Sequence, residues 1–386
     1  MTHLDEELRM MRDEARKFTE NEVLPEANER DPEGEAMSTE LRDKLGEMGF
    51  FGITAREEYG GLGMGPLALA VVTEELARGW MSVASIIVRG GGFRGTDEQE
   101  ERWARDMATG DRLHAVAISE PQAGSDVSNV ATTAEKDGDE YILNGEKMWC
   151  TFAKGADGIE VLAKTNLEDR RMARFVIDKP PETFDYDGLE GQKLDTIGYH
   201  GWHSYHLQLN NVRVPKENLV GGEEGGAFSS TLSGLTMARI HTAARSIGLA
   251  RGALEDSLEY AQQREQFDQP IGQFQSIRFK LATMATKIEA ARQLTHSVAA
   301  KASEEPGLRY DREAGMAKYF ASEMSEEVTS EGIQIHGGNG YTTDYPLERY
   351  WRDARLTKIF EGTSEIQQRI ISKRLFEDGV HGGALQ

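Results

Sequence analysis

The sequence contains a single cysteine, Cys150, among its 386 residues. One thiol cannot form an intrachain disulfide, and its isolation disfavours a structural zinc cluster, so the composition fits a reducing cytoplasm. The sequence also lacks any apolar run of transmembrane length. Its charged opening, MTHLDEELRMMRDEARKF, has no apolar segment of the kind that a secretory signal requires. We therefore expect a soluble, cytoplasmic protein.

Positive charge is also scarce. The chain carries 44 lysines and arginines against 66 aspartates and glutamates, a formal net charge of −22, and arginine outnumbers lysine. This balance disfavours nucleic acid and anionic membrane as partners. An acidic, lysine-poor surface suits a solvent of high ionic strength, where self-repulsion is screened, so the composition predicts a salt-adapted, halophilic host.

The length exceeds what one hydrophobic core usually serves, so we expect two or three domains and room for a large cofactor. Apolar residues recur at helical spacing over residues 1–112. Over 113–226 they alternate or run continuously, as in the strands of a sheet. Helical spacing returns over 227–386. The pattern predicts an α+β protein with an N-terminal helical domain, a middle β domain and a C-terminal helical bundle.

Local signals refine this picture. A helix is expected over 38–48, and Pro66 can open the next one as its first residue. Within the β domain, Asp137-Gly138-Asp139 and Asn144-Gly145-Glu146 both read as hairpin turns. In the bundle, Arg251 is the one charge on an apolar stripe, and its long stem can lie along the core while its head reaches water.

Near the C-terminus, one carboxylate stands out between two expected helices. A helix ends at Gly337-Gly338, and Pro346 opens another. Glu361 follows that second helix in a short loop. Ser364 and Gln367 then have the spacing of a capping box for the last helix. Most loop carboxylates are solvated, and local sequence alone favours that ordinary role for Glu361.

A second motif suggests a dinucleotide site. A β-branched run precedes Gly90, Gly92 and Gly95, which have the G-x-G-x-x-G spacing of a Rossmann turn, and this would predict NAD binding. Four carboxylates follow within 97–101, at the helix N-terminus where a pyrophosphate needs positive potential. The motif alone is weak, so we favour the other interpretation of this segment, given next.

Four segments carry a resemblance to one family. AISEPQAGSDVSN (117–129) resembles the N-terminal signature of the acyl-CoA dehydrogenases, and QIHGGNGYTTDYPLERYWRD (334–353) resembles their C-terminal signature. FEGTSEIQ (360–367) resembles their catalytic loop, and GTDEQEERWARDMATGD resembles a helix of their N-terminal domain. The resemblance covers essentially the whole chain. It implies an N-terminal helical domain, a middle β-barrel or sandwich and a C-terminal four-helix bundle, with FAD between the β domain and the bundle.

The resemblance also implies an activity. The family desaturates acyl-CoA at the α,β bond, a base removing the α-proton while a hydride leaves the β-carbon for flavin N5. Glu361 occupies the position of the base. In some relatives the base instead precedes the arginine that matches Arg239, but here that position is Ala238, which cannot serve. The family passes its electrons to an electron-transfer flavoprotein.

Further site residues follow from the resemblance, position by position. Trp149 would offer an aromatic face to the flavin and Thr151 a hydroxyl at N5, whereas Phe152 replaces an asparagine common in the family. A neighbouring subunit would contribute the segment REQFDQPI, in which Asp268 replaces a glycine. The expected cofactor-binding residues are Val116, Ile118, Ser119, Ser125, Trp149, Thr151, Arg264, Phe267, Gln275, Gln334, Gly337, Gly338, Thr363 and Glu365, and the expected substrate-binding residues are Ser125, Arg239 and Gly362.

Partners and alternatives complete the prediction. An arginine contributed across a subunit boundary implies at least a dimer, and the family usually pairs dimers into tetramers. A relative on the same fold could instead reduce oxygen or oxidise a non-CoA substrate. A non-catalytic flavoprotein that binds nucleic acid is a third possibility, which the acidic charge opposes.

The substrate is expected to depend on the segment RGGGFRG, which replaces an apolar helix of the family. If Arg89 and Arg94 point outward as solvated charges, the pocket takes a branched or medium apolar acyl chain. If one of them points inward it needs an anion, and a dicarboxylyl-CoA becomes plausible. Because exposed arginines are the commoner case, we expect both to point outward.

Overall fold

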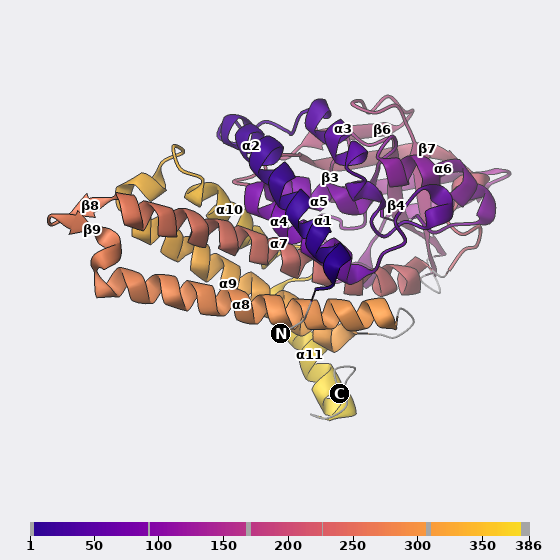
Figure 1. Cartoon of the computed structure of the whole chain (residues 1–386). Coiled ribbons are helices and arrows are strands. Elements are labelled where there is room, and N and C mark those ends of the chain that lie inside the picture. The colour runs from indigo at the N-terminus through magenta and orange to yellow at the C-terminus, as the bar shows by residue number, and fades with distance from the viewer. Residues whose placement is uncertain (1–3, 92, 167–170, 226, 306–309, 380–386) are drawn as a thin grey trace.

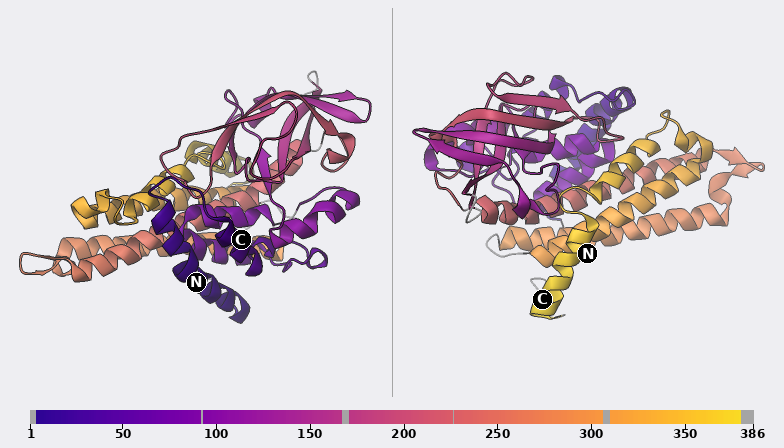
Figure 2. Two further views of the ribbon diagram at one scale, coloured as in Figure 1. Left: turned by 90° about the horizontal axis from the view of Figure 1, so that it is seen from above. Right: turned by 180° about the vertical axis from the view of Figure 1, so that it is seen from behind.

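The structure is a computed structural model that describes residues 4–91, 93–166, 171–225, 227–305 and 310–379. The N-terminal helices and a curled sheet lie together on one side of the molecule, and long helices lie side by side on the other (Figure 1). Two further views separate the sheet from the N-terminal helices (Figure 2). Among the described residues, no helix combines the length and the apolar character that a bilayer span requires.

The N-terminal part is helical because its capping residues stand where helices begin. Asp5 caps α1 and Ser38 caps α3 through their side chains, Pro66 opens α4, and Thr96 with Gln99 forms a capping box on α6. The helices are α1 (Glu6–Phe18), α2 (Leu24–Arg30), α3 (Thr39–Glu47), α4 (Pro66–Gly79), α5 (Met81–Ile86) and α6 (Asp97–Thr109).

The Rossmann interpretation is wrong. The β-branched run before the glycines forms α5 and one 3-10 turn, Ile87–Arg89, so no strand leads into the glycine turn. Gly90 has a packing reason instead: a Cβ there would lie 2.5 Å from the side chain of Phe51 and 2.4 Å from the carbonyl oxygen of Met107. The glycine lets this turn sit against α6.

The middle part is a seven-stranded sheet with the strand order β1-β4-β2-β3-β7-β6, and β5 pairs with β4. The turn at Asp137-Gly138-Asp139 is confirmed, since it joins β2 to β3. The second expected hairpin is wrong, because Asn144-Gly145-Glu146 lies inside β3, at a register shift against β7. The strands are β1 (His114–Ala117), β2 (Thr133–Asp137), β3 (Glu140–Thr151), β4 (Gly158–Asn166), β5 (Arg171–Asp178), β6 (Leu189–Lys193) and β7 (Ser204–Pro215).

The C-terminal part is a bundle of long helices. Ile240 and Ile247 of α7 share a core with Met284 and Ile288 of α8 and with Val328 of α9. A small hairpin joins α7 to α8 at one end of the bundle (Figure 1). The elements are α7 (Ala227–Gln263), β8 (Glu265–Gln266), β9 (Gln269–Pro270), α8 (Gln275–Glu304), α9 (Asp311–His336), α10 (Leu347–Thr357) and α11 (Ser364–Asp378).

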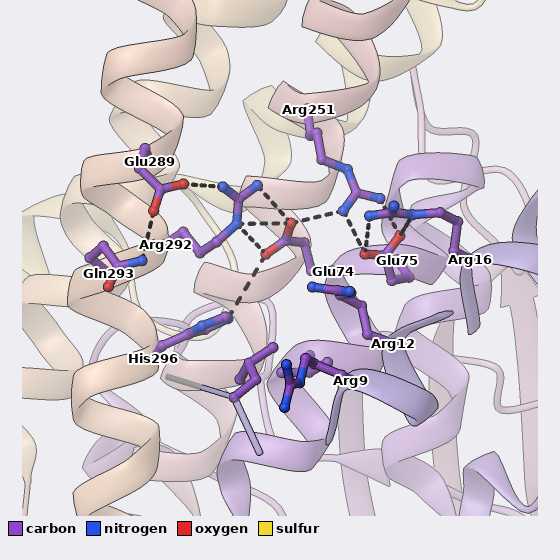
Figure 3. Close-up of a pocket in the computed structure, with 12 residues that line it drawn as sticks. Arg9, Arg12, Arg16, Glu74, Glu75, Arg251, Glu289, Arg292, Gln293 and His296 are labelled. Atoms are coloured by element: carbon purple, nitrogen blue, oxygen red, sulfur yellow. Dashed lines mark hydrogen bonds and ion pairs between the residues drawn. The ribbon is translucent and has the colours of Figure 1, made fainter. Parts of the chain in front are cut away.

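Arg251 differs from expectation because its head does not reach water. It is buried, and its guanidinium contacts Glu74 at 3.0 Å and Glu75 at 2.7 and 2.5 Å. Figure 3 shows this network where α4, α7 and α8 meet, with Arg16 of α1 and Arg292 of α8 completing it. Burial alone would raise the pKa of Glu74, but Arg292 and Arg251 outweigh it and lower the value to about 2. The cluster ties the N-terminal helices to the bundle.

Two helix starts near the C-terminus are displaced from their predicted residues. Pro346 is the cap of α10, whose first helical residue is Leu347. The expected capping box on α11 is also wrong: Thr363 is the cap and accepts from the backbone of Ile366, whereas the Ser364 hydroxyl donates to Glu323.

Candidate functional site

Glu361 lies in the short loop between α10 and α11, as predicted. Its backbone is left-handed, with φ of 54°, and that of Gly362 is too, with φ of 87°. Such a conformation is costly for a side-chain-bearing residue and persists only where its surroundings hold it. Here the Nζ of Lys318 donates to the carbonyl oxygen of Gly362 at 2.8 Å, and Gln367 donates to the same oxygen at 2.9 Å. The loop is therefore fixed from behind while the Glu361 side chain is exposed.

Lys318 is a residue that sequence reasoning missed. It lies on α9 with its side chain completely buried, and burial lowers its pKa to about 8. The negative charge of Glu361 acts in the opposite direction, and the positive charges of Arg245 and Arg239 add to the lowering. A single lysine within an apolar helical stripe is the signal that could have found it, because lysine is almost never fully buried without a specific partner.

The end of β3 presents an exposed aromatic ring. A register shift against β7 between Lys147 and Cys150 gives Trp149 a φ of 62° and leaves its side chain 58% exposed. The hydroxyl of Thr151 lies 2.9 Å from that of Ser204. A bulge is a means of re-aiming a side chain out of a sheet, and here it turns a large indole outward.

The 117–129 segment is anchored to β3. The Nζ of Lys147 donates to the carbonyl of Ile118 at 3.0 Å, and the backbone N–H of Met148 donates to that of Ser119 at 2.8 Å. The buried carboxylate of Glu120 binds Lys147 at 2.7 Å and accepts from the backbone and hydroxyl of Thr132. Burial would raise the pKa of Glu120, but these partners hold it below its ordinary value. Glu120 therefore fixes the segment.

The remaining residues expected in this segment lie at its edges. Val116 and Ile118 are half-buried on and just after β1, and Ser125 is exposed in the loop that follows.

Arg239 is buried on α7. Its Nη1 lies 3.3 Å from Asp311, the first residue of α9. Its charge also acts on Lys318 behind the Glu361 loop. The structure thus brings Arg239 into the neighbourhood of Glu361, although the two residues are far apart in the sequence.

The expectation for the two arginines of RGGGFRG holds for one of them only. Arg94 is exposed. Arg89 turns inward: its guanidinium lies over the ring of Trp202, 5.6 Å from the centroid, and its charge interacts with Tyr199, Glu361 and Arg245. Burial lowers the pKa of Arg89 from its ordinary value.

The residues expected to serve a neighbouring subunit lie elsewhere. Arg264 and Phe267 are in the exposed hairpin at the end of the bundle, and Phe267 is 87% exposed. Phe267 and Asp268 have left-handed backbones, with φ of 52° and 62°. Within one chain these residues do not join the Glu361 loop (Figure 1). The other exposed positions of this group are Gln275, Gln334, Gly337 and Gly338, while Glu365 is exposed in the first turn of α11.

Family models match almost the whole chain. Residues 5–111 match the N-terminal domain of acyl-CoA dehydrogenases, 115–212 the middle domain and 225–376 the C-terminal domain.

Individual proteins match with similar coverage. The (2S)-methylsuccinyl-CoA dehydrogenase of Cereibacter sphaeroides is 39% identical over 97% of this chain and 70% of its own length. The Caffeyl-CoA reductase-Etf complex subunit CarC of Acetobacterium woodii is 36% identical over 97% of this chain and 100% of its own. A glutaryl-coenzyme A dehydrogenase solved with glutaryl-CoA is 34% identical, with a TM-score of 0.93, over 99% of this chain and 98% of that one.

Proposed function

The chain belongs to the acyl-CoA dehydrogenase family, and we propose that it converts an acyl-CoA thioester to the trans-2-enoyl-CoA with Glu361 as the base. The observation that carries this proposal is the loop between α10 and α11. It holds an exposed carboxylate in a left-handed conformation, supported from behind by Lys318 and Gln367.

Glu361 takes the α-proton at its carboxylate. A base must lie within hydrogen-bond reach of the carbon whose proton it removes, so the position of the loop decides its effectiveness. Gln367 also donates to the carbonyl oxygen of Glu361 at 3.3 Å. Because the C=O and N–H of a trans peptide point in opposite directions, this contact turns the N–H of Gly362 away from Gln367. We infer that this N–H donates to the thioester oxygen beside the base.

The residues of the β domain suit a flavin. The family is FAD-dependent, and FAD, when bound, would supply the acceptor for the hydride of the substrate β-carbon. In this chain the exposed indole of Trp149 can lie against the isoalloxazine, and the half-buried hydroxyl of Thr151 can donate to it. Cys150 between them is buried, and burial raises the pKa of its thiol to about 12, so no thiolate competes at this site. Val116, Ile118, Ser119 and Ser125 supply the adjoining edge.

The exposed hairpin suits a second copy of the chain. We assign Arg264, Phe267 and Gln275, with the exposed Gln334, Gly337 and Gly338, to FAD held by a neighbouring subunit. An arginine suits a pyrophosphate because it is always charged and binds bidentately. Thr363 caps α11, so it acts on the site by placing the loop. A flavin-loaded monomer by light scattering would contradict this assignment; a dimer or tetramer is expected.

The proposal is tested by flavin reduction. The purified protein should be yellow, and an acyl-CoA should bleach it under anaerobic conditions. Glu361→Gln should still bind acyl-CoA yet reduce its flavin more slowly by roughly three orders of magnitude or more. Near-normal reduction in this variant would reject Glu361 as the base.

The electron acceptor needs a separate assay. We propose an electron-transfer flavoprotein, because CarC carries an Etf complex in its name. Turnover should therefore require that protein. Stoichiometric peroxide formation without it would identify an oxidase instead.

A further inference from the structure

Two guanidinium groups, those of Arg89 and Arg245, lie beside the proposed base without a carboxylate partner among the described residues. This distinguishes them from Arg251 and Arg239, which are buried as Arg245 is but form ion pairs with Glu75 and Asp311. The Nε atoms of both Arg89 and Arg245 are buried and have no hydrogen-bond partner. In a chain with an excess of 22 acidic charges, a buried and a half-buried cation that form no ion pair among the described residues call for an explanation, although Glu361 and Glu160 also attract Arg89.

Arg245 is held by neutral groups only. It is buried on α7, and its Nη1 donates to the hydroxyl of Ser85 at 2.8 Å and to that of Tyr199 at 3.3 Å. Its Nη2 donates to Thr242 at 2.9 Å. These hydroxyls orient the guanidinium but leave its charge uncompensated. The group lies over the ring of Phe360, 4.5 Å from the centroid, and Phe360 directly precedes Glu361.

Arg89 reaches the same region, beside Phe360 and Glu361, from the N-terminal part of the chain. It follows α5, and its half-buried side chain lies over Trp202. Trp202 packs edge-on against Tyr199 with centroids 5.4 Å apart, and Tyr199 packs edge-on against Phe360 with centroids 5.8 Å apart. The aromatic rings therefore form a continuous wall from Arg89 to the residue before the base. The charges of Arg89, Arg245 and Glu361 all act on Tyr199.

The backbone conformation of Tyr199 shows that the surrounding structure holds this arrangement in place. Tyr199 has a left-handed φ of 63°, and its N–H donates to Asp353 at 2.6 Å. A non-glycine residue in that region is strained, and the contact with Asp353 holds it there. The strain places the Tyr199 hydroxyl on Arg245. Burial raises the pKa of that hydroxyl, so it is neutral and cannot balance the cation.

We propose that the acyl chain of the substrate ends in a carboxylate, which Arg89 and Arg245 bind while Glu361 faces the α-carbon. The proposal rests on the function proposed above. A carboxylate would give the two guanidinium groups the bidentate partner that the described residues do not supply. Because Arg245 lies over the residue adjacent to the base, the acyl chain is short. The named relatives act on acyl groups of several kinds, so this choice rests on the residues of this chain.

The test uses isosteric pairs of substrates. Succinyl-CoA is compared with 4-methylpentanoyl-CoA, and glutaryl-CoA with 5-methylhexanoyl-CoA, because an isopropyl group has nearly the shape of a carboxylate. The rate of anaerobic flavin bleaching divided by the half-saturating concentration should favour the dicarboxylic member of at least one pair by about 10²-fold. Arg89→Leu should reduce that ratio to near one, and Arg89→Lys should restore part of it.

Arg94→Leu is the matched control, since it removes the same charge from an exposed position of the same segment. It should leave the ratio unchanged. To separate binding from chemistry, glutaryl-CoA is titrated calorimetrically into the flavin-loaded Glu361→Gln protein with and without Arg245→Gln, and the second substitution should weaken binding by roughly 10²-fold. If Arg89→Leu loses its flavin, the substrate ratio of Arg89→Lys is compared with that of the wild-type protein instead.

Each outcome has a distinct meaning. If the branched apolar member of both pairs is the better substrate, or if 3-phenylpropanoyl-CoA exceeds all four, the carboxylate proposal is wrong and the dehydrogenase function stands. If Arg89→Leu alters only the flavin spectrum and leaves the ratio intact, the cations serve the cofactor and the proposal is again wrong. If no acyl-CoA bleaches the flavin, the proposed function itself fails.

Discussion

Lys318→Met should slow the reaction without destabilising the protein. In the unfolded chain the ammonium has an ordinary pKa of 10.5, and burial lowers it to about 8 in the fold. At about 1.4 kcal/mol per tenfold change in proton affinity, keeping Lys318 charged costs roughly 3 kcal/mol at neutral pH. The contact with the Gly362 carbonyl returns about 1.5–3 kcal/mol, as is usual for a hydrogen bond to a charged group. The two effects nearly cancel, so methionine, which fills the same space, should change stability by less than about 2 kcal/mol.

The pH dependence gives a second measurement. Because Lys318 binds its proton more weakly in the fold, the unfolded chain takes up a proton between pH 8 and 10.5. The wild-type protein should therefore gain stability over that interval, and the penalty is present in full below pH 8. Lys318→Met should lack this gain. The free energies of unfolding of the wild-type and Lys318→Met proteins are measured with denaturant at pH 7.5 and pH 10. Lys373→Met, which removes a charge from an exposed position, is the control.

The kinetic effect follows from the loop. Without the Lys318 contact, the Gly362 carbonyl keeps only Gln367, and the left-handed backbone of Glu361 is less well determined. Flavin reduction should fall by about tenfold to a hundredfold, since small misplacements of a catalytic group have effects of that size. A variant that reduces its flavin at the wild-type rate would show that the loop does not depend on Lys318. A loss of several kcal/mol would show that the buried charge is a net stabiliser.

Three further substitutions test the supports of the site. Glu120→Gln should destabilise the protein by about 3–5 kcal/mol in denaturant unfolding, because it leaves the buried charge of Lys147 without its partner. Gly145→Ala should lower stability by more than about 1 kcal/mol, since φ there is 146° and a Cβ would lie within 3 Å of its neighbours. Asp353→Asn should stabilise the protein at pH 8 by up to about 4 kcal/mol, because burial and the nearby Asp31 raise the pKa of Asp353 from its ordinary 3.8 to about 7 and so disfavour its ionised form in the fold. Equal stabilities at pH 8 would contradict this.

The sequence was a reliable guide wherever one local signal decided the structure. Pro66 and Ser38 mark helix starts because their chemistry suits those positions irrespective of the rest of the fold. Gly138 gives a hairpin for the same reason. Gly145 misled because a glycine also suits a bulge inside a strand, and only the approach of β2, which no local pattern encodes, distinguishes the two. The capping box on α11 failed by one residue, because Ser364 and Thr363 are both capable caps.

The charged residues show where local reasoning ends. The sequence predicts a solvated head for Arg251 and assigns no role to Lys318, yet both are buried, as is Arg239, and each one's partner lies on another element. Sequence spacing predicts which face of a helix a residue occupies. It does not predict which other element packs against that face, because this depends on the tertiary structure. Carboxylates on α4 and α9 and a backbone carbonyl after α10 supply the missing partners.

Arg89 carries this argument furthest, because it forms no ion pair with any carboxylate in the part of the chain that the structure describes. It points inward since α5 and the following turn are packed against the N-terminal core, with Gly90 closed onto Phe51. The turn therefore has one orientation, and Arg89, its last residue, lies over the ring of Trp202. Arg245 repels the charge of Arg89, whereas Glu361, the proposed base, and Glu160 attract it. On our proposal, a substrate carboxylate would bind both arginines. On our proposal, the departure from the family pattern in RGGGFRG therefore changes what the site binds, because it directs the Arg89 cation toward the acyl chain.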